Sequence, residues 1–362
     1  MNDINKGNAI EIKDANENDA VTYIPPLLEV RGLTKFFPVK QGIFPRTVGQ
    51  VHAVDDISFT LERGETLGLV GESGCGKSTV GKTLLRLVHP TYGSVKFEGR
   101  DIVGMKRREL RELRRDVQII FQDPFESLNS RHTVRKILSE PFIIHRLGTK
   151  AEREQRVCEL LNRVGLDESA ANRFPHEFSG GQRQRIGIAR AIALKPKLVV
   201  CDEAVSALDV SVQSQVVNLL LDLQAEMDLA LIFIAHDLAV VKHVSDKIAV
   251  MYLGQIVETS TSEDIYRAPK HPYTQALISA IPVADPTRRP DRIILKGDVP
   301  SPILPPNGCR FHTRCRYAQP RCSEEAPPLE LASDSSSRGS AACFFWDDLK
   351  LSHTQTEKIA SN

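Results

Sequence analysis

The sequence predicts an α/β fold whose core is a mixed or parallel sheet. Apolar runs that suit buried strands, at residues 198–201 and 231–234, flank a segment at 216–227 whose apolar residues repeat at helical spacing. Strand, helix and strand in this order favour a parallel sheet. A further apolar run at 66–70 leads straight into a glycine-rich loop and a helix-compatible segment. That context is typical of α/β domains that bind phosphate groups.

Length and composition set the first limits on function. The chain has 362 residues, which indicates one large domain with an appendage. Its 47 basic and 46 acidic residues leave a formal net charge of +1, so the charge balance does not indicate nucleic acid as a partner. The basic runs at 106–108 and 114–115 alternate with acidic residues. We interpret them as a solvated helix face.

The sequence also bears on location. No apolar run approaches the roughly 18 residues that a membrane span needs. The first 25 residues lack the apolar core and basic leader of a signal peptide. These observations predict residence in the cytosol, with a disordered tail at residues 1–26.

The elements follow one another in a consistent order. Strand-rich segments at 27–30, 57–61 and 93–97 predict an antiparallel β subdomain around the glycine-rich loop. A short apolar run at 117–121 predicts a buried strand that stops before Pro124. The residues that follow, about 123–185, are predicted to form an inserted helical subdomain. Within it, Thr149 and Glu152 fit a helix capping box.

The C-terminal part differs in composition. From about residue 268 proline becomes dense and regular periodicity fades. We therefore expect a nucleotide-binding domain at 27–265, a small Cys- and Pro-rich C-terminal domain at 266–350 and a tail at 351–362.

The glycine-rich loop reads G-x-x-x-x-G-K-S from Gly71 to Ser78. Its glycines allow backbone N–H groups to surround a polyphosphate, Lys77 can reach the terminal phosphates, and the Ser78 hydroxyl can ligate Mg²⁺. The positive end of the following helix adds to this site. The predicted phosphate-binding residues are Gly71, Ser73, Gly74, Gly76, Lys77, Ser78 and Thr79.

A second motif delivers two adjacent carboxylates at the end of an apolar strand. Asp202 and Glu203 follow residues 198–201 directly. Asp202 is suited to hold Mg²⁺, and Glu203 to orient and deprotonate a water that attacks the phosphate. An exposed acidic turn would be the simpler reading of this pair alone, but the phosphate loop upstream makes the catalytic reading stronger.

A third motif identifies the class. The run from Phe178 to Arg185 reads F-S-G-G-Q-R-Q-R, and it resembles the L-S-G-G-Q signature of ABC ATPases. The resemblance implies a P-loop NTPase fold of the ABC type. It also implies that Ser179, Gly180, Gly181 and Gln182, at a helix N-terminus, bind the γ-phosphate of an ATP held by the opposite subunit. ATP and Mg²⁺ are the cofactors that this family uses.

The resemblance extends to single positions. Gln122 matches the Q-loop residue that contacts Mg²⁺ and the attacking water, Asp209 matches the D-loop, and His236 matches the switch histidine that senses the γ-phosphate and orients the catalytic glutamate. Phe37 is the best match for the aromatic residue that stacks on adenine, with Phe36 and His52 as alternatives. Two positions depart from the family pattern without losing a functional group: Phe178 replaces leucine and Ala204 replaces proline.

Within the family, residues 27–346 resemble the ATP-binding subunits of oligopeptide and dipeptide importers. The similarity is carried by the segments 35–42, 121–129, 205–213 and 271–277. It implies ATP-driven import by a dimer with a second ATPase subunit, identical or different, on two integral membrane permeases supplied by an extracytoplasmic solute-binding protein. The chain would then lie on the cytoplasmic face of the inner membrane. Importers of nickel, glutathione or cationic peptides share the subfamily and remain alternatives.

A soluble ABC-type ATPase outside transport is a more remote alternative. Such proteins usually carry two cassettes or a long coiled coil, and neither is evident in this sequence. A non-catalytic regulatory module is disfavoured because Lys77, Asp202, Glu203 and His236 are all present.

Four of the seven cysteines crowd the C-terminal domain, at Cys309, Cys315, Cys322 and Cys343. Four thiolates can bind a [4Fe–4S] cluster or a structural Zn²⁺ ion. The short spacing typical of zinc sites is absent, and related subunits in the subfamily resemble iron–sulfur carriers, so the cluster is favoured over zinc. Unligated thiols are the remaining alternative, since disulfides are disfavoured in the cytosol.

Overall fold

A computed structural model describes residues 25–41, 46–282, 292–331 and 339–349. Most of the predicted N-terminal tail, and all of the tail at 351–362, lie outside these ranges. Within them, no helix combines the length and the apolar character needed to cross a membrane.

The centre of the molecule is a mixed sheet with the order β11-β12-β10-β9-β3-β8-β7-β6 in the described residues. Neighbours from β9 to β6 are parallel, and β10, β11 and β12 extend the sheet in antiparallel pairs. The strands are β3 (Thr66–Val70), β6 (Val117–Ile120), β7 (Leu198–Asp202), β8 (Ala230–Ala235), β9 (Lys247–Tyr252), β10 (Gln255–Thr261), β11 (Glu330–Leu331) and β12 (Ser340–Ala341). Every residue of β3, β7 and β8 is buried, as expected for parallel strands covered on both faces. The predicted α/β fold is confirmed.

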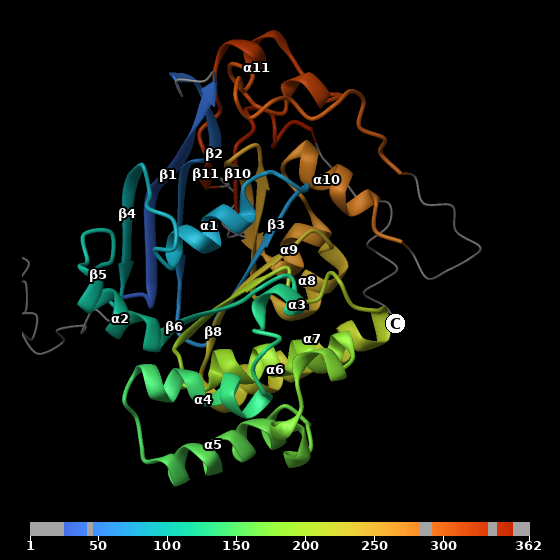
Figure 1. Cartoon of the computed structure of the whole chain (residues 1–362). Helices are drawn as coiled ribbons and strands as arrows, with labels where there is room; N and C mark the ends of the chain where they lie inside the picture. The colour runs from blue at the N-terminus through green and yellow to red at the C-terminus, as the bar shows by residue number, and fades with distance from the viewer. Residues whose placement is uncertain (1–24, 42–45, 283–291, 332–338, 350–362) are drawn as a thin grey trace, which may run out of the picture.

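A second, antiparallel sheet packs on one side of the central sheet (Figure 1). It has the order β2-β1-β4-β5, and its strands are β1 (Leu28–Gln41), β2 (Arg46–Leu61), β4 (Tyr92–Phe97) and β5 (Arg100–Asp101). One apolar cluster lies between the two sheets and includes Val30, Ile57 and Val95 from this sheet and Leu69 and Ile232 from the central sheet. The helix α1 (Lys77–Leu84) contributes Val80 and Leu84 to the same cluster.

The other face of the central sheet is covered by helices, which Figure 1 shows below it. The inserted helical segment contains α3 (Pro124–Ser127), α4 (Val134–Ile144), α5 (Lys150–Arg163), the 3-10 helices η1 (Glu168–Asn172) and η2 (Pro175–Glu177), and α6 (Gly180–Ile192). The predicted capping box is present at α5: Thr149 Oγ1 accepts from the Glu152 amide at 3.3 Å, and the Glu152 carboxylate accepts from the Thr149 amide. Apolar side chains of α4, α5 and α6 join a second cluster that continues to Phe233 of β8.

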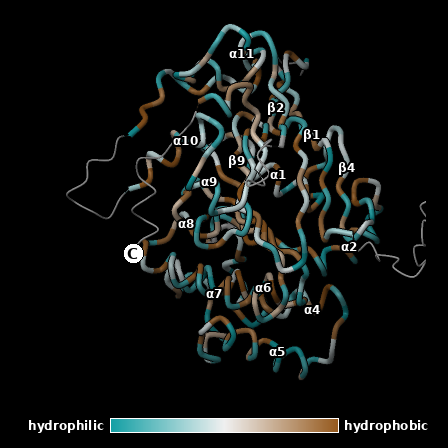
Figure 2. Tube along the Cα trace, turned by 180° about the vertical axis from the view of Figure 1, so that it is seen from behind, coloured by the Kyte–Doolittle hydropathy of each residue, from teal (hydrophilic) through white to brown (hydrophobic). Residues whose placement is uncertain are grey.

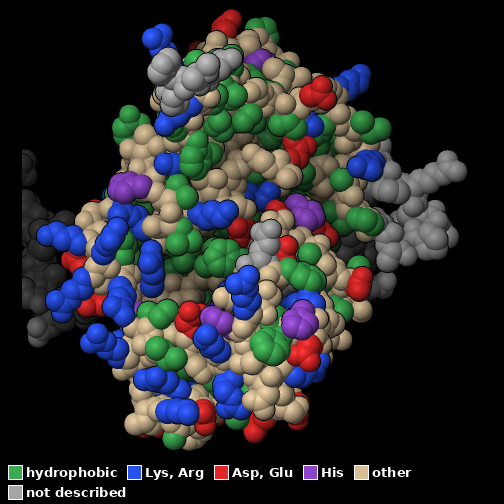
Figure 3. Space-filling model, viewed as in Figure 1, with side chains coloured by type: hydrophobic (Ala, Val, Ile, Leu, Met, Phe, Trp, Pro, Cys, Tyr) green, Lys and Arg blue, Asp and Glu red, His purple; other side chains and the backbone are tan. Residues whose placement is uncertain are grey.

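The remaining helices connect the strands or support the C-terminal part. They are α2 (Arg107–Asp116), α7 (Val210–Met227), α8 (Leu238–Val244), α9 (Ser262–Arg267), α10 (Pro272–Ser279), the 3-10 helix η3 (His312–Arg314) and α11 (Pro320–Glu324). The basic runs predicted to form a solvated face lie on and just before α2, whose one buried residue is Leu113. Figure 3 shows Lys and Arg side chains gathered over this part of the surface.

The C-terminal region shares its core with the rest of the protein. Phe311 is 1% exposed and belongs to the same apolar cluster as Tyr252 of β9 and Tyr273 of α10. Its strand β12 pairs with β10, so this region also completes an edge of the central sheet. In Figure 2 the hydrophobic segments concentrate along the central strands and the helix faces turned toward them. Folding of the C-terminal region therefore depends on contacts with strands of the central sheet.

The helical segment offers a test of this core. Leu161 of α5 is fully buried, whereas Ile143 of α4 is 53% exposed. We expect Leu161→Ala to lower the free energy of unfolding by about 3 kcal/mol, because it removes buried methyl groups and leaves a cavity. The matched change Ile143→Ala should cost less than about 1 kcal/mol. The measurement is the urea midpoint of the first unfolding transition, and equal shifts in the two variants would contradict this packing.

Candidate active site

The glycine-rich loop connects β3 to α1, as the sequence predicts. Gly76 is the N-cap of α1 and has φ of 109°, and a Cβ atom there would lie 1.9 Å from the Ala53 carbonyl oxygen. Only glycine fits this position. Gly76 and the first residues of α1 line a cavity, and a helix N-terminus favours an anion.

Lys77 is buried at the base of the loop. Its Nζ donates hydrogen bonds to the carbonyl oxygens of Gly71, at 2.8 Å, and Glu72, at 3.0 Å. Its side chain is 3% exposed. No carboxylate among the described residues forms an ion pair with it, and burial strengthens the attraction of such an ammonium group for an anion.

Two oxygen ligands meet beside Lys77. The Ser78 hydroxyl donates to Oδ1 of Asp202 at 2.6 Å, although 124 positions separate the two residues in the chain. Asp202 is the last residue of β7 and is 4% exposed. Hydroxyl and carboxylate oxygens are suitable ligands for Mg²⁺, which prefers oxygen.

Two polar side chains from two different strand ends flank the carboxylate of Glu203, which follows a third strand. Glu203 follows β7 and has a φ of 48°, a left-handed conformation that is uncommon for a residue with a side chain. Its Oε2 accepts a hydrogen bond from Gln122 Nε2 at 2.7 Å and lies 3.7 Å from Nδ1 of His236. Gln122 lies two residues after β6, and His236 follows β8 directly. The structure therefore brings together the three predicted catalytic residues.

A single cavity connects the phosphate loop to Glu203. Of the predicted residues, it is lined by Phe37, Ser73, Gly74, Gly76, Lys77, Ser78, Thr79, Gln122 and Glu203. The sequence left Phe36 and His52 open as alternatives to Phe37. Their rings pack against each other with centroids 4.1 Å apart, and neither lines the cavity.

Three further residues line this cavity and were missed by the sequence analysis: Val51, Ala53 and Pro302. Val51 pairs with Phe37 across the antiparallel sheet. A correct prediction of how β1 pairs with β2 would therefore have placed Val51 beside Phe37 in the cavity. Pro302 comes from the C-terminal region, and its carbonyl oxygen accepts from the His52 amide at 2.9 Å. No local signal in the proline-rich segment pointed to this contact.

The signature residues lie apart from the phosphate loop. Ser179 is the N-cap of α6, with reciprocal hydrogen bonds between Ser179 and Gln182. Gly180 lines a second cavity together with Gln122, Glu203 and His236. Gly181 packs against Val212, and Asp209 is exposed at the N-terminus of α7. None of these residues lines the cavity that contains Lys77.

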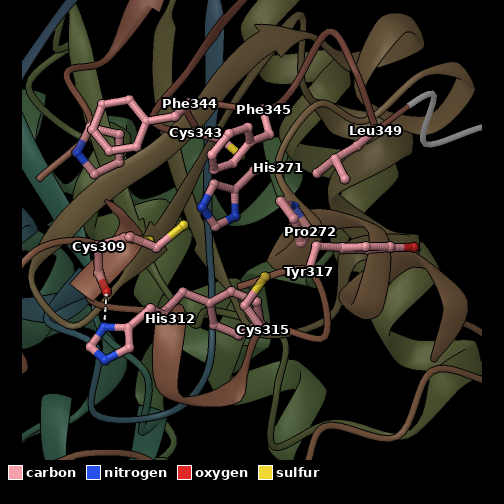
Figure 4. Close-up of a pocket in the computed structure, with 13 residues that line it drawn as sticks. His271, Pro272, Cys309, His312, Cys315, Tyr317, Cys343, Phe344, Phe345 and Leu349 are labelled. Carbon is pink, nitrogen blue, oxygen red and sulfur yellow. Dashed lines mark hydrogen bonds between the residues drawn. The ribbon is translucent and has the colours of Figure 1, made fainter. Parts of the chain in front are cut away.

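The four C-terminal cysteines line another cavity, with aromatic side chains around it. Figure 4 shows Cys309, Cys315 and Cys343 turned toward the same space, close to His271. Burial raises the pKa of Cys309 to about 12 and that of Cys343 to about 11, and the neighbouring sulfurs contribute to both increases. All seven cysteines are free thiols. In the described ranges, no three His, Cys, Asp or Glu side chains are grouped to hold a metal ion.

Comparison with known proteins agrees with this geometry. Residues 54–206 match the family model for ABC transporters, and residues 257–322 match that for the C-terminal region of oligopeptide/dipeptide transporters. The chain is 54% identical to the oligopeptide transport ATP-binding protein AppF of Bacillus subtilis, covering 85% of this chain and 95% of that protein. It is 53% identical to OppF of Salmonella typhimurium, another oligopeptide transport ATP-binding protein, covering 84% and 92%.

Solved structures agree as well. The dimeric ATP-binding cassette MJ0796, bound to ADP and Pi in a post-hydrolysis state, is 28% identical with a TM-score of 0.58, covering 65% of this chain and 98% of that one. CbiO1 of Clostridium perfringens, part of an ABC transporter complex, gives a TM-score of 0.57 at 27% identity, covering 67% and 90%. The phosphate loop, the carboxylates at the end of β7 and these matches show that the chain belongs to the ATP-binding proteins of oligopeptide-type ABC transporters.

Proposed function

We propose that the chain is the ATP-hydrolysing subunit of a membrane importer for dipeptides or oligopeptides. The observation that carries the proposal is that Gln122, Glu203 and His236 meet, and that Gln122 and Glu203 line the same cavity as Lys77. The peptide assignment is supported by the match of residues 257–322 to the C-terminal region of oligopeptide/dipeptide transporters. The relatives named for oligopeptide transport are similar over most of the chain.

The residues in and beside the cavity have different roles in ATP hydrolysis. Lys77 and the amides at the start of α1 bind the β- and γ-phosphates, and Phe37 stacks on the adenine. Glu203 accepts the proton of the attacking water, while Gln122 and His236 hold the carboxylate and the water in place. Mg²⁺, when bound, neutralises phosphate charge. Ser78, Asp202 and Gln122 would hold it, because their oxygen atoms suit this ion.

Each nucleotide needs a second subunit. Ser179, Gly180, Gly181, Gln182 and Asp209 lie at α6 and α7, away from the cavity of their own Lys77. In our proposal they contact the ATP that is bound by the phosphate loop of a second ATPase subunit, identical or different. The signature residues of that subunit complete the ATP site of this chain in the same way. The dimeric state of the similar cassette MJ0796 supports this arrangement.

The remaining partners follow from the transport function. Two integral membrane permeases would use closure of the ATPase dimer to change conformation, and an extracytoplasmic solute-binding protein would deliver the peptide. The chain would then be peripheral on the cytoplasmic face of the inner membrane.

We further propose that the four C-terminal cysteines hold a [4Fe–4S] cluster. Their thiols line one apolar cavity, which fits a cofactor held by four cysteines. A Zn²⁺ ion held by the same four thiols is the alternative. No group of three or more His, Cys, Asp or Glu side chains suited to a metal ion is found in the described residues, so the proposal depends on the four thiols sharing one cavity. The cluster would act as a structural cross-link of the C-terminal region.

The catalytic role of Glu203 has a direct test. Glu203→Gln keeps the size of the side chain but cannot accept the proton of the attacking water. We expect ATP binding to persist and hydrolysis to fall by about 100-fold or more, with ATP trapping a closed dimer. Size-exclusion chromatography with ATP and Mg²⁺, together with phosphate release, measures both effects. The exposed Glu263 provides a control, Glu263→Gln. Turnover of Glu203→Gln at the wild-type level would overturn the assignment.

The cluster is tested by metal and sulfide analysis of protein purified without oxygen. We expect iron and acid-labile sulfide in the wild type and in Cys158→Ser, since Cys158 lies on α5 outside the cysteine cavity. Cys315→Ser should lose most of both. Stoichiometric zinc without sulfide would replace the cluster by a zinc ion, and the absence of any metal would leave the thiols unligated.

A further inference from the structure

An ion pair joins the phosphate loop to the C-terminal region. Glu72 is the second residue of the loop, and its two carboxylate oxygens accept hydrogen bonds from the two terminal nitrogens of Arg314, at 2.8 and 3.2 Å. The Arg314 side chain is 8% exposed, whereas that of Glu72 is 28% exposed. A bidentate ion pair of this kind fixes the orientation of both side chains as well as the distance between them.

The backbone of Glu72 is held from the same side. Its amide donates a hydrogen bond to the Tyr273 hydroxyl at 2.9 Å. The ring of Tyr273 packs against Tyr252, with centroids 4.8 Å apart, and against Phe311, at 5.3 Å. The Arg314 guanidinium lies over the Tyr252 ring, 6.0 Å from its centroid. Both the side chain and the amide of Glu72 are therefore anchored to groups outside the loop.

This anchor reaches the residue that meets the phosphates. The carbonyl oxygen of Glu72 is one of two carbonyl acceptors for Lys77 Nζ. A shift of Glu72 would therefore move an acceptor that positions the Lys77 ammonium group. The path from Arg314 to Lys77 contains only one intermediate residue.

Charge gives Arg314 a second effect. A carboxylate within a loop that binds a polyphosphate repels the ligand unless a cation compensates it. Arg314 supplies that cation, and burial of its side chain limits screening by solvent. Burial alone would lower the pKa of Arg314, but the hydrogen bonds and charge of Glu72 and Tyr252 outweigh it, so the pKa is raised. The guanidinium is charged at every physiological pH.

We infer that Arg314 is a positioning residue for ATP binding, which neutralises Glu72 and holds the phosphate loop in the shape that Lys77 requires. The inference rests on the proposed role of the loop in binding ATP, but it is independent of the solute that is transported. It makes the C-terminal region a contributor to the nucleotide site, 242 positions away from Glu72 in the chain.

The test compares the affinity for ATP in the full-length protein. Arg314→Met keeps an unbranched apolar stem but removes the guanidinium group and its charge. We expect it to weaken binding of ATP with Mg²⁺ by about tenfold, which corresponds to about 1.4 kcal/mol. Arg316→Met is the matched control, because Arg316 is exposed and lies two residues further on. Titration calorimetry gives the dissociation constants. The rate at saturating ATP should change less than twofold, since Arg314 does not contact Glu203.

A second substitution separates positioning from simple stabilisation. In Arg314→Met, adding Glu72→Gln removes the uncompensated carboxylate, so we expect the double variant to recover at least threefold in affinity. Loss of fold stability alone would not be recovered in this way. If Arg314→Met does not fold, Arg314→Lys takes its place, because it keeps the charge but cannot form the bidentate pair. We expect its affinity for ATP to be about threefold lower than that of the wild type.

Two results would overturn the inference. One is a folded Arg314→Met, or in its place Arg314→Lys, that binds ATP as tightly as the wild type. The other is a double variant that binds no better than Arg314→Met. A wild-type protein that itself fails to bind ATP would instead refute the proposed nucleotide site, so the two failures are distinguishable.

Discussion

The active site depends on four parallel strands that end level with one another. In the register of the central sheet, Val70 lies opposite Ala235, Asp202 opposite Ile234 and Ile120 opposite Cys201. The phosphate loop, Gln122, Glu203 and His236 therefore all follow the C-terminal ends of these strands, on the same side of the molecule, although they come from widely separated parts of the chain. Complete burial of β3, β7 and β8 keeps these ends in place, because a slip by one residue would turn apolar side chains to the wrong face.

The parts of this site that could be predicted from the sequence depend on neighbours along the chain. A strand, a glycine-rich loop and a helix in succession predict where Lys77 lies, because the loop conformation is local. Adjacent carboxylates after an apolar run predict the tip of β7 in the same way. Gln122 and His236 needed the family resemblance, since a lone glutamine or histidine after a strand has no distinctive local pattern.

The parts that could not be predicted arise from contacts between distant segments. The choice between Phe36 and Phe37 depends on which face of β1 each residue occupies, and the pairing of β1 with β2 shifts between Lys35 and Phe36. Alternation alone cannot carry the face across such a shift. Pro302 reaches the nucleotide cavity only because the C-terminal region folds back over β2. Composition identified that region as an appendage but could not show where it packs.

The packing of the C-terminal region has a thermodynamic consequence. The rings of Phe311, Tyr252 and Tyr273 contact one another, and both Phe311 and His271 also line the cysteine cavity. The same aromatic cluster therefore supports the phosphate loop on one side and the four thiols on the other. Any energetic coupling between the two sites through this cluster is reciprocal. If a group that orders the cysteine cavity favours the loop shape that binds ATP, bound ATP stabilises the cavity by the same free energy.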